Sequence, residues 1–265
     1  MRFVPDHDLH IHTQLSPCSR DARQTPEAIL AYGITAGMKL LNLADHCWPD
    51  TQAAVLSRPE NLPQSKYCTL LHGAEVDMDM HDNLSAPIEA IEQMDFAVIA
   101  VNHLHLKNYC VPNDFPEDAQ THKKRFQERV HHLLSLDLPF YKTGLAHFSD
   151  GLVCTAEHIK CLDLFTENEL IDIFTKVKKV GMGVELNMVS SRFSGHDLDS
   201  VLRPLRIAKA LGCKFYMGGD AHHPDDFAGT LSKKMNPMID LLGLEESDKL
   251  PFIPETIARI RANHT

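Results

Sequence analysis

The segment Val4-Pro-Asp-His-Asp-Leu-His-Ile-His12 ends in two histidines that stand two positions apart. Side chains with this spacing on a strand point to the same face, so His10 and His12 can reach one ion. A short apolar run that ends in His, Asp or Glu occurs seven times along the chain. These runs are Val4–His12, Lys39–His46, Leu70–Glu75, Phe96–His103, Phe140–His147, Met182–Glu185 and Phe215–His222.

Segments with helix signals lie between these runs. Thr25-Pro-Glu27 is typical of a helix start, and we expect this helix to run to Ala36 and stop at Gly37. Thr166 followed by Glu169 fits a capping box for a helix over 166–180. Other helices are expected over 86–93, 116–136, 196–211 and 254–262, and strands over 4–12, 39–44, 70–78, 96–101, 140–146, 181–187 and 214–218.

Strands that alternate with helices favour a parallel sheet with right-handed crossovers. Potential ligand residues follow nearly every strand, which favours an α/β barrel with one site at the C-terminal ends of its strands. A nucleotide-binding sheet has no support, because the chain has no G-x-G-x-x-G after the first strand and no Walker A motif. We expect residues 1–265 to form a single domain, since the chain has no linker or repeat.

Composition restricts the classes of function. The formal net charge of -10 argues against binding to a nucleic acid polymer. No apolar run approaches the roughly 18 residues that a membrane span needs. The N-terminal segment lacks the apolar core of a signal peptide, and the seven cysteines include no C-x-x-C pair, so we expect a cytoplasmic protein with free thiols. Oligomeric state has no signal in the sequence.

The strongest candidate ligands are N and O donors at the strand ends: His10, His12, His46, Glu75, His103, His147, Asp220 and His222. Imidazole with carboxylate suits Zn, Mn or Fe better than Ca or Mg. Eight candidates exceed what one tetrahedral ion needs, and a carboxylate such as Glu75 can bridge two ions. The set therefore predicts two or three divalent metal ions, an arrangement used to cleave phosphate esters.

The motifs occur in a fixed order: Asp8-Leu-His10-Ile-His12-Thr, Ala44-Asp45-His46, Gly73-Ala-Glu75-Val-Asp77, Asn102-His103, Ala146-His147, Glu185-Leu-Asn187 and Gly219-Asp220-Ala-His222. This ordered set resembles the PHP (polymerase and histidinol phosphatase) family over residues 8 to about 229. The resemblance implies a distorted (β/α)7 TIM-like barrel with a trinuclear metal site.

The resemblance also implies three ligand sets, which are His10, His12, Glu75 and Asp220, then Glu75, His103 and His147, and finally His46 and His222 with a residue from the loop after His12. We expect Asp21 to be that last residue, with Cys18 as the alternative. Family members carry His or Asp five or six positions past the second His, where this chain has Pro17 and Cys18. Asp45 and Glu185 are expected to support ligands rather than bind metal.

The activity implied by the resemblance is hydrolysis of a phosphomonoester by metal-activated water. The expected substrate is a small phosphorylated metabolite, such as histidinol phosphate or a nucleotide phosphate. The expected catalytic residues are His222, His223 and Arg192, because leaving-group protonation needs an acid and a phosphate binds cations. Arg20, Arg23 and Lys107 are further candidates for holding phosphate.

Two other functions fit parts of the pattern. A barrel amidohydrolase that cleaves C–N or ester bonds uses similar ligands, often with a carboxylated Lys on a strand, but Lys39 begins its strand and Lys142 lies within one. A non-catalytic metal-binding module is the other alternative, of the kind found inside polymerases. Substrate specificity is expected to lie in loops 102–116 and 188–196, which contain no diagnostic motif.

Overall fold

The computed structural model describes residues 1–263 except 20, 58, 60, 151 and 228–230. Seven parallel strands follow one another in the order of the sequence: β1 (His7–Ile11), β2 (Leu40–Leu43), β3 (Thr69–Asp77), β4 (Phe96–Ala100), β5 (Thr143–Leu145), β6 (Gly183–Asn187) and β7 (Lys214–Gly218). This sheet curves into a nearly closed, distorted (β/α)7 barrel, as the sequence predicts.

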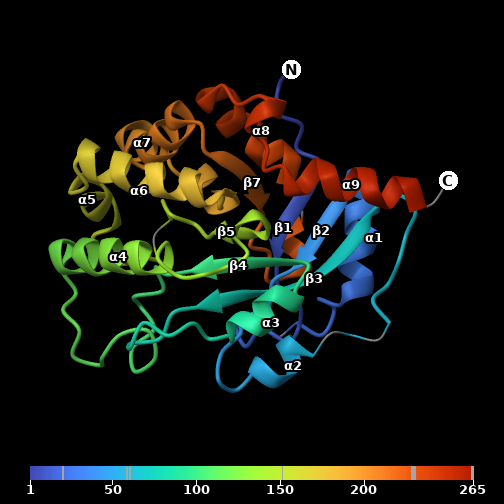
Figure 1. Cartoon of the computed structure of the whole chain (residues 1–265), viewed down its shortest axis with the longest axis horizontal. Helices are drawn as coiled ribbons and strands as arrows, with labels where there is room; N and C mark the ends of the chain where they lie inside the picture. The colour runs from blue at the N-terminus through green and yellow to red at the C-terminus, as the bar shows by residue number, and fades with distance from the viewer. Residues whose placement is uncertain (20, 58, 60, 151, 228–230, 264–265) are drawn as a thin grey trace.

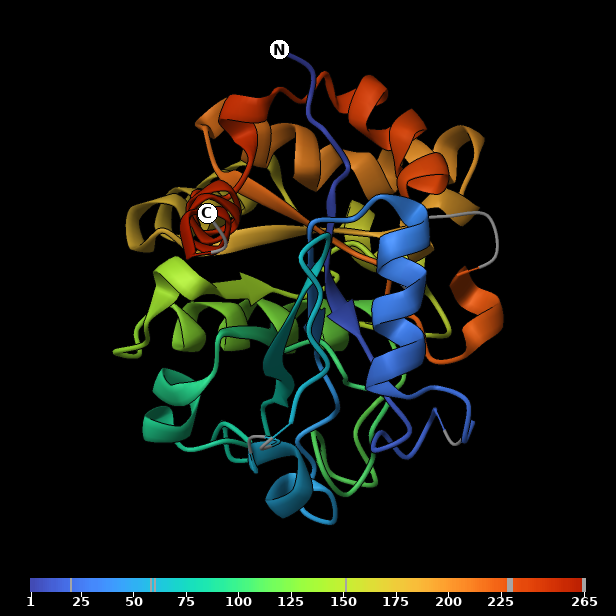
Figure 2. The same cartoon turned by 90° about the vertical axis from the view of Figure 1, so that its right-hand side faces the viewer.

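Helices surround the strands in Figure 1 and in Figure 2. They are α1 (Pro26–Ala36), α2 (Gln52–Leu56), α3 (Ile88–Gln93), α4 (Ala119–Leu133), α5 (His158–Asp163), α6 (Glu167–Val180), α7 (Gly195–Leu211), α8 (Leu231–Leu242) and α9 (Phe252–Asn263). Short 3-10 turns are η1 (Phe140–Lys142), η2 (Met188–Arg192), η3 (Pro224–Phe227) and η4 (Glu246–Asp248).

The first and last strands meet through hydrogen bonds that lie near the ligand residues. The amide of Asp220, just after β7, donates to the carbonyl of His10 on β1 at 2.7 Å. The side chain of Asp8 replaces a main-chain acceptor, because its Oδ1 accepts from the amide of Gly219 at 2.8 Å. The junction that closes the barrel is therefore at its C-terminal end, where the chemistry of such folds is found.

The opposite end of the barrel is filled with apolar side chains. Phe96, the first residue of β4, packs inside with Tyr216 of β7, and their ring centroids are 5.3 Å apart. Gly144 is needed beside them, since a Cβ there would lie 2.3 Å from the Tyr216 ring. Phe252 of α9 packs on Phe96 with centroids 5.2 Å apart. Thus α9 covers the N-terminal end of the barrel.

Helix signals in the sequence agree with the structure where the cap residues are clear. Thr25 caps α1 through a bond from the Ala28 amide, and α1 ends before Gly37, whose φ is 73°. The expected strand 140–146 is wrong at its start, because Phe140–Lys142 form a 3-10 turn. There the Lys142 amide donates back to Pro139, which bends the chain before β5 begins. Helix α5 was not predicted.

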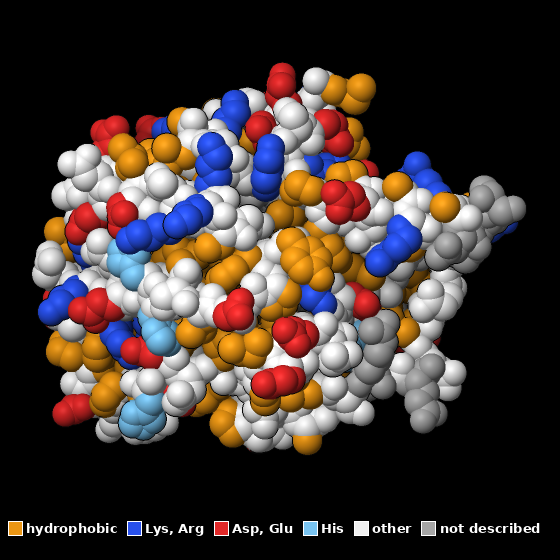
Figure 3. All heavy atoms as spheres, in the orientation of Figure 1, with side chains coloured by type: hydrophobic (Ala, Val, Ile, Leu, Met, Phe, Trp, Pro, Cys, Tyr) orange, Lys and Arg blue, Asp and Glu red, His pale blue; other side chains and the backbone are white. Residues whose placement is uncertain are grey.

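Charged side chains of both signs are interspersed on the face shown in Figure 3. Within the part of the chain that the structure describes, no helix has the length and apolar character needed to cross a membrane.

Candidate metal centre

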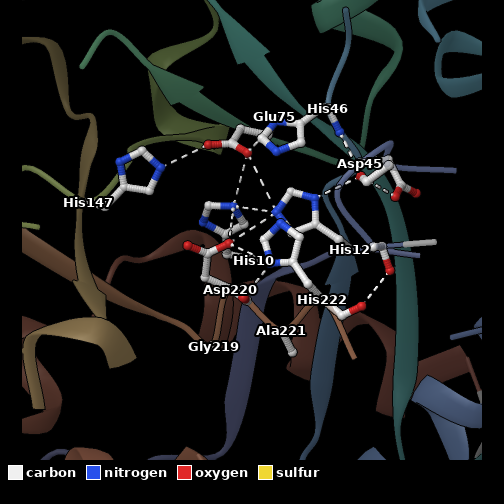
Figure 4. A network of polar contacts seen from close by, with 12 residues as sticks. His10, His12, Asp45, His46, Glu75, His147, Gly219, Asp220, Ala221 and His222 are labelled. Atoms are coloured by element: carbon white, nitrogen blue, oxygen red, sulfur yellow. Dashed lines mark hydrogen bonds and ion pairs between the residues drawn. The ribbon is translucent and has the colours of Figure 1, made fainter. Parts of the chain in front are cut away.

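The strand ends bring together the eight side chains that the sequence singles out as ligands. All of them except His103 are labelled in Figure 4. His10 lies on β1, His12 one residue past it, and Glu75 within β3. The remaining five follow β2, β4, β5 and β7. Six of the eight are buried, whereas Asp220 and His222 are partly exposed. Four overlapping groups of three have donor atoms within 4.8 Å of one another.

Glu75 lies at the centre of this cluster, and its two carboxylate oxygens face different rings. Oε1 is 2.9 Å from Nε2 of His147 and 3.5 Å from Nε2 of His103. Oε2 is 2.8 Å from Nδ1 of His46 and 3.5 Å from Nε2 of His10. Burial raises the pKa of Glu75, but the surrounding histidines outweigh burial and hold that pKa well below its ordinary value. An ionised carboxylate shared in this way has the geometry of a bridging ligand.

His10 and His12 turn their Nε2 atoms toward each other at 3.1 Å. Oδ1 of Asp220 is 3.1 Å from Nε2 of His12 and 3.6 Å from Nε2 of His10. At most one hydrogen can lie between the two Nε2 atoms. The lone pairs of Nε2 and of the Asp220 carboxylate therefore point into the same small space. This convergence of nitrogen and oxygen donors fits a divalent cation of the zinc type.

The site attracts positive charge. Burial lowers the pKa of His10, but Asp220, Glu185 and Glu75 outweigh it and raise the pKa well above its ordinary value. Burial likewise lowers the pKa of His147, yet Asp150 and Glu75 raise it to about 10. Carboxylates therefore dominate the field at these two rings, which favours cations there. At His12, burial and the neighbouring His222 instead hold the pKa well below its ordinary value, which keeps that ring neutral and able to bind metal.

Hydrogen bonds from outside the cluster orient the rings. Four rings place Nδ1 against an acceptor: His10 against Glu185 (2.8 Å), His12 against Ser16 (2.9 Å), His103 against Asp77, and His222 against the Asp220 carbonyl (2.9 Å). Ser16 in turn donates to Asp45 at 2.7 Å. Bonds of this kind fix the tautomer and leave Nε2 free to bind metal. Glu185 and Asp45 thus contact the ligand set from outside.

Sequence reasoning assigned no role to Asp77, which accepts from Nδ1 of His103 and from Nε1 of Trp48 at 2.6 Å. The signal was present, because Asp77 follows Glu75 by two positions and so shares its strand face. Trp48 also stacks on His46, with ring centroids 4.2 Å apart and planes at 18°. These contacts link the ligands on β2, β3 and β4.

Backbone conformation at the site is specialised. A Cβ on Gly218 would lie 1.8 Å from Oε1 of Glu185 and 2.9 Å from Cβ of His10, so only glycine leaves room for that pair. His147 and Asp220 have positive φ angles of 25° and 52°. Residues other than glycine are strained at positive φ. They persist there where the surrounding structure holds the backbone in place, often at functional sites.

A cavity of about 220 Å³ opens onto the cluster. It is lined by Cys18, His46, Trp48, Glu75, His103, His105, His147, Leu152, Asp220 and His222. No Lys or Arg is among these described lining residues. The lining thus offers imidazoles, carboxylates and a thiol around a space suited to a small ligand.

Of the three expected catalytic residues, one is among the residues that line the cavity. His222 lines the cavity, whereas Arg192 is exposed and is not among the lining residues. His223 is exposed, and its Nδ1 is 3.9 Å from Oδ2 of Asp21. Of the other expected cations, Lys107 donates to the Phe115 carbonyl at 2.6 Å. Arg23 pairs with Asp21, and Arg20 falls outside the described residues.

The loop after β1 differs from the expected arrangement. The carboxylate of Asp21, the expected ligand, accepts from Arg23 at 2.6 Å and does not line the cavity. Cys18 does line it, and its thiol contacts the side chains of His222 and His46. Burial raises the pKa of this thiol, but hydrogen bonds with His222 and His46 outweigh burial and bring the pKa to about 7.

The sequence matches no protein-family model and no curated protein. Solved structures do resemble the fold. One is a histidinol phosphate phosphatase from Lactococcus lactis subsp. lactis Il1403 in complex with zinc, L-histidinol and phosphate, with a TM-score of 0.59 and 12% identity over 93% of this chain and 99% of that chain. Another, from Listeria monocytogenes and assigned as a histidinol phosphatase, has a TM-score of 0.55 and 14% identity over 83% and 96%. At these identities the likeness establishes the fold.

Proposed function

We propose that this chain is a metal-dependent phosphomonoesterase that acts on a small phosphorylated metabolite. The observation that carries the proposal is the convergence of eight residues with N and O donors in one cluster, six of which line the cavity, with most rings oriented from outside by hydrogen bonds. The fold supports it, because a structure with the same architecture contains zinc, phosphate and L-histidinol. Histidinol phosphate and nucleotide phosphates are the substrates to test first.

The proposed centre has three sets of ligands: His10, His12, Glu75 and Asp220; Glu75, His103 and His147; and His46 and His222 with a residue from the loop after β1. Glu75 would be shared, in keeping with the two directions in which its oxygens face. Bound Zn, Mn or Fe would polarise a phosphoryl oxygen and supply activated water at neutral pH.

The chain's own residues would orient the substrate. Because no described Lys or Arg lines the cavity, the phosphate charge would be met by the cations that the cluster holds. Trp48 and Leu152 offer apolar contact to the organic part of a substrate, and the volume of about 220 Å³ limits that part to a small group. His222 can be the acid for the leaving oxygen only when the third metal is not bound to its ring, because its Nδ1 already faces the Asp220 carbonyl. His223 and Arg192, the other proposed catalytic residues, lie outside the lining.

The test is release of inorganic phosphate from a panel of phosphomonoesters by the purified protein, loaded in parallel with Zn, Mn or Fe. We expect metal-dependent turnover that is lost in Asp220→Asn and kept in Arg206→Ala, since Arg206 is exposed and pairs with the exposed Asp199. Absence of phosphate release from every ester, with metal bound, would overturn the proposal. Hydrolysis of cyclic amides instead would favour an amidohydrolase.

A further inference from the structure

We propose that the thiolate of Cys18 is a ligand of the third metal, so that this site combines sulfur with the imidazoles of His46 and His222. The inference rests on the metal centre proposed above and names a ligand in the loop after β1. It gives that site a softer donor set than the other two sites, whose ligands are imidazoles and carboxylates.

Anchors on both sides of Cys18 fix its place in the loop. The hydroxyl of Ser16 donates to Oδ1 of Asp45 at 2.7 Å. The hydroxyl of Ser19 donates to the carbonyl of His222 at 2.5 Å. Because the second anchor is on the main chain of a proposed ligand, the loop holds Cys18 beside His222, although the residue also remains exposed to solvent.

The donor atoms around the thiol are already gathered. Nitrogens of His12, His46 and His222 lie within 4.8 Å of one another, and the thiol contacts the last two. His46 is only 6% exposed, and its Nδ1 is 2.8 Å from Oε2 of Glu75 without meeting hydrogen-bond geometry. Ring nitrogens, carboxylate oxygens and a thiol thus converge on this place with few hydrogens to share between them. A cation held by these rings and Cys18 would satisfy the converging lone pairs.

Asp21, the competing ligand, is occupied elsewhere. Its carboxylate accepts from Nη2 of Arg23 at 2.6 Å and from Nε at 3.0 Å. Moving it to the cluster would break this paired contact and leave Arg23 with the more distant carboxylate of Asp225, at 4.0 Å. The geometry therefore assigns the third site to Cys18.

A thiolate in this position has a consequence for metal preference. Sulfur ligands select zinc over manganese, whereas imidazole with carboxylate accepts both. We expect zinc to fill all three sites of the wild-type protein and manganese to fill two. Cys18→Asp exchanges the soft ligand for a carboxylate, so it should restore the third manganese.

Cobalt substitution tests the bond itself. The full-length protein loaded with Co(II) should have a sulfur-to-cobalt charge-transfer band in the near ultraviolet. Cys18→Ala should lose the band and one of three metal equivalents. Cys47→Ala is the matched control, since Cys47 is buried beside His46 but its thiol donates to the Ser85 carbonyl at 3.5 Å, so band and metal content should be unchanged.

Alkylation provides a second test that uses the wild-type protein, so its result does not depend on whether a variant folds. Of the seven free thiols, Cys18 is exposed and the other six are buried. Iodoacetamide should therefore modify Cys18 alone after metal removal, and saturating zinc should prevent this. Equal alkylation with and without zinc, or three bound cobalt ions without the sulfur band, would overturn the Cys18 assignment and leave the proposed phosphatase intact. Failure to bind any metal would instead overturn the proposed function.

Discussion

Glu75 connects more of the proposed ligands than any other single side chain described above. Its oxygens face rings on or just after four other strands, so removing its charge should affect two metals together. We expect Glu75→Gln to reduce bound zinc from three equivalents to about one. Metal analysis after dialysis against a zinc buffer measures this directly. A variant with full zinc content would contradict the bridging role.

Glu185→Gln is the matched comparison, because Glu185 orients His10 without facing the metal cluster as Glu75 does. Loss of an outer hydrogen bond typically weakens metal affinity about 10–100-fold. The stoichiometry at saturating zinc should therefore stay complete, while a competition titration should reveal the weaker binding. Equal losses of zinc in both carboxamide variants would remove the distinction between ligand and support.

Single residues were predictable where a strand dictates the direction of the side chain. His10 and His12 follow from their spacing alone, and the same rule would have found Asp77. The loop after β1 has no such periodicity. There the choice between Cys18 and Asp21 depends on tertiary contacts, namely the pairing of Asp21 with Arg23, which spacing does not encode.

Among the elements, α6 begins with a complete capping box. The amide of Glu169 donates to Oγ1 of Thr166 at 3.3 Å, and the amide of Thr166 donates to Glu169 at 2.8 Å. We expect Thr166→Ala to lower the free energy of unfolding by about 1 kcal/mol in urea titrations. Thr35→Ala is the control, because the Thr35 hydroxyl bonds to the Ala31 carbonyl within α1 and caps no helix end. This substitution should change stability little. Equal effects would argue against the cap.

The carboxylate of Glu169 also makes α6 sensitive to acid. Burial raises its pKa, but bonds from Lys123 and Thr166 outweigh burial and lower the pKa to about 2. The pKa of Glu in an unfolded chain is about 4.3, so this stabilisation is complete above that pH and is lost as pH falls toward 2. The stability difference between wild type and Glu169→Gln should narrow over this range in urea titrations. A constant difference would contradict the assignment.

Elements with explicit caps were the ones that the sequence predicted well, as at α1 and α6. Helix α5 was missed because it has only six residues and Glu157 makes no side-chain cap bond. The strand expected from Phe140 fails for a different reason. An apolar run alone does not distinguish a strand from a turn, and here bonds of Lys142 to the carbonyls of Glu92 and Met94, at the C-terminal end of α3, hold the turn.

For the whole molecule, the barrel brings together ligands that are far apart in the chain, from His10 to His222. Metal bound to them would hold the junction of β1 and β7, where Asp220 already bonds to His10. A cation that binds only the folded chain adds about 2.7 kcal/mol of stability at 100 times its dissociation constant. For a chain of this size that corresponds to roughly 5–10 °C in melting temperature.

Chelation should therefore lower the melting temperature of the zinc-loaded protein by several degrees, and added zinc should restore it. Glu75→Gln should respond less, because it has fewer metals to lose, whereas Thr166→Ala should start lower and shift by the same amount. This pattern separates stability that comes from metal from stability that comes from α6. If calorimetry finds the same melting temperature with and without chelator, the strand ends hold their arrangement without metal. Closure then relies on the hydrogen bonds between the first and last strands, such as those of Asp8, Asp220 and His12.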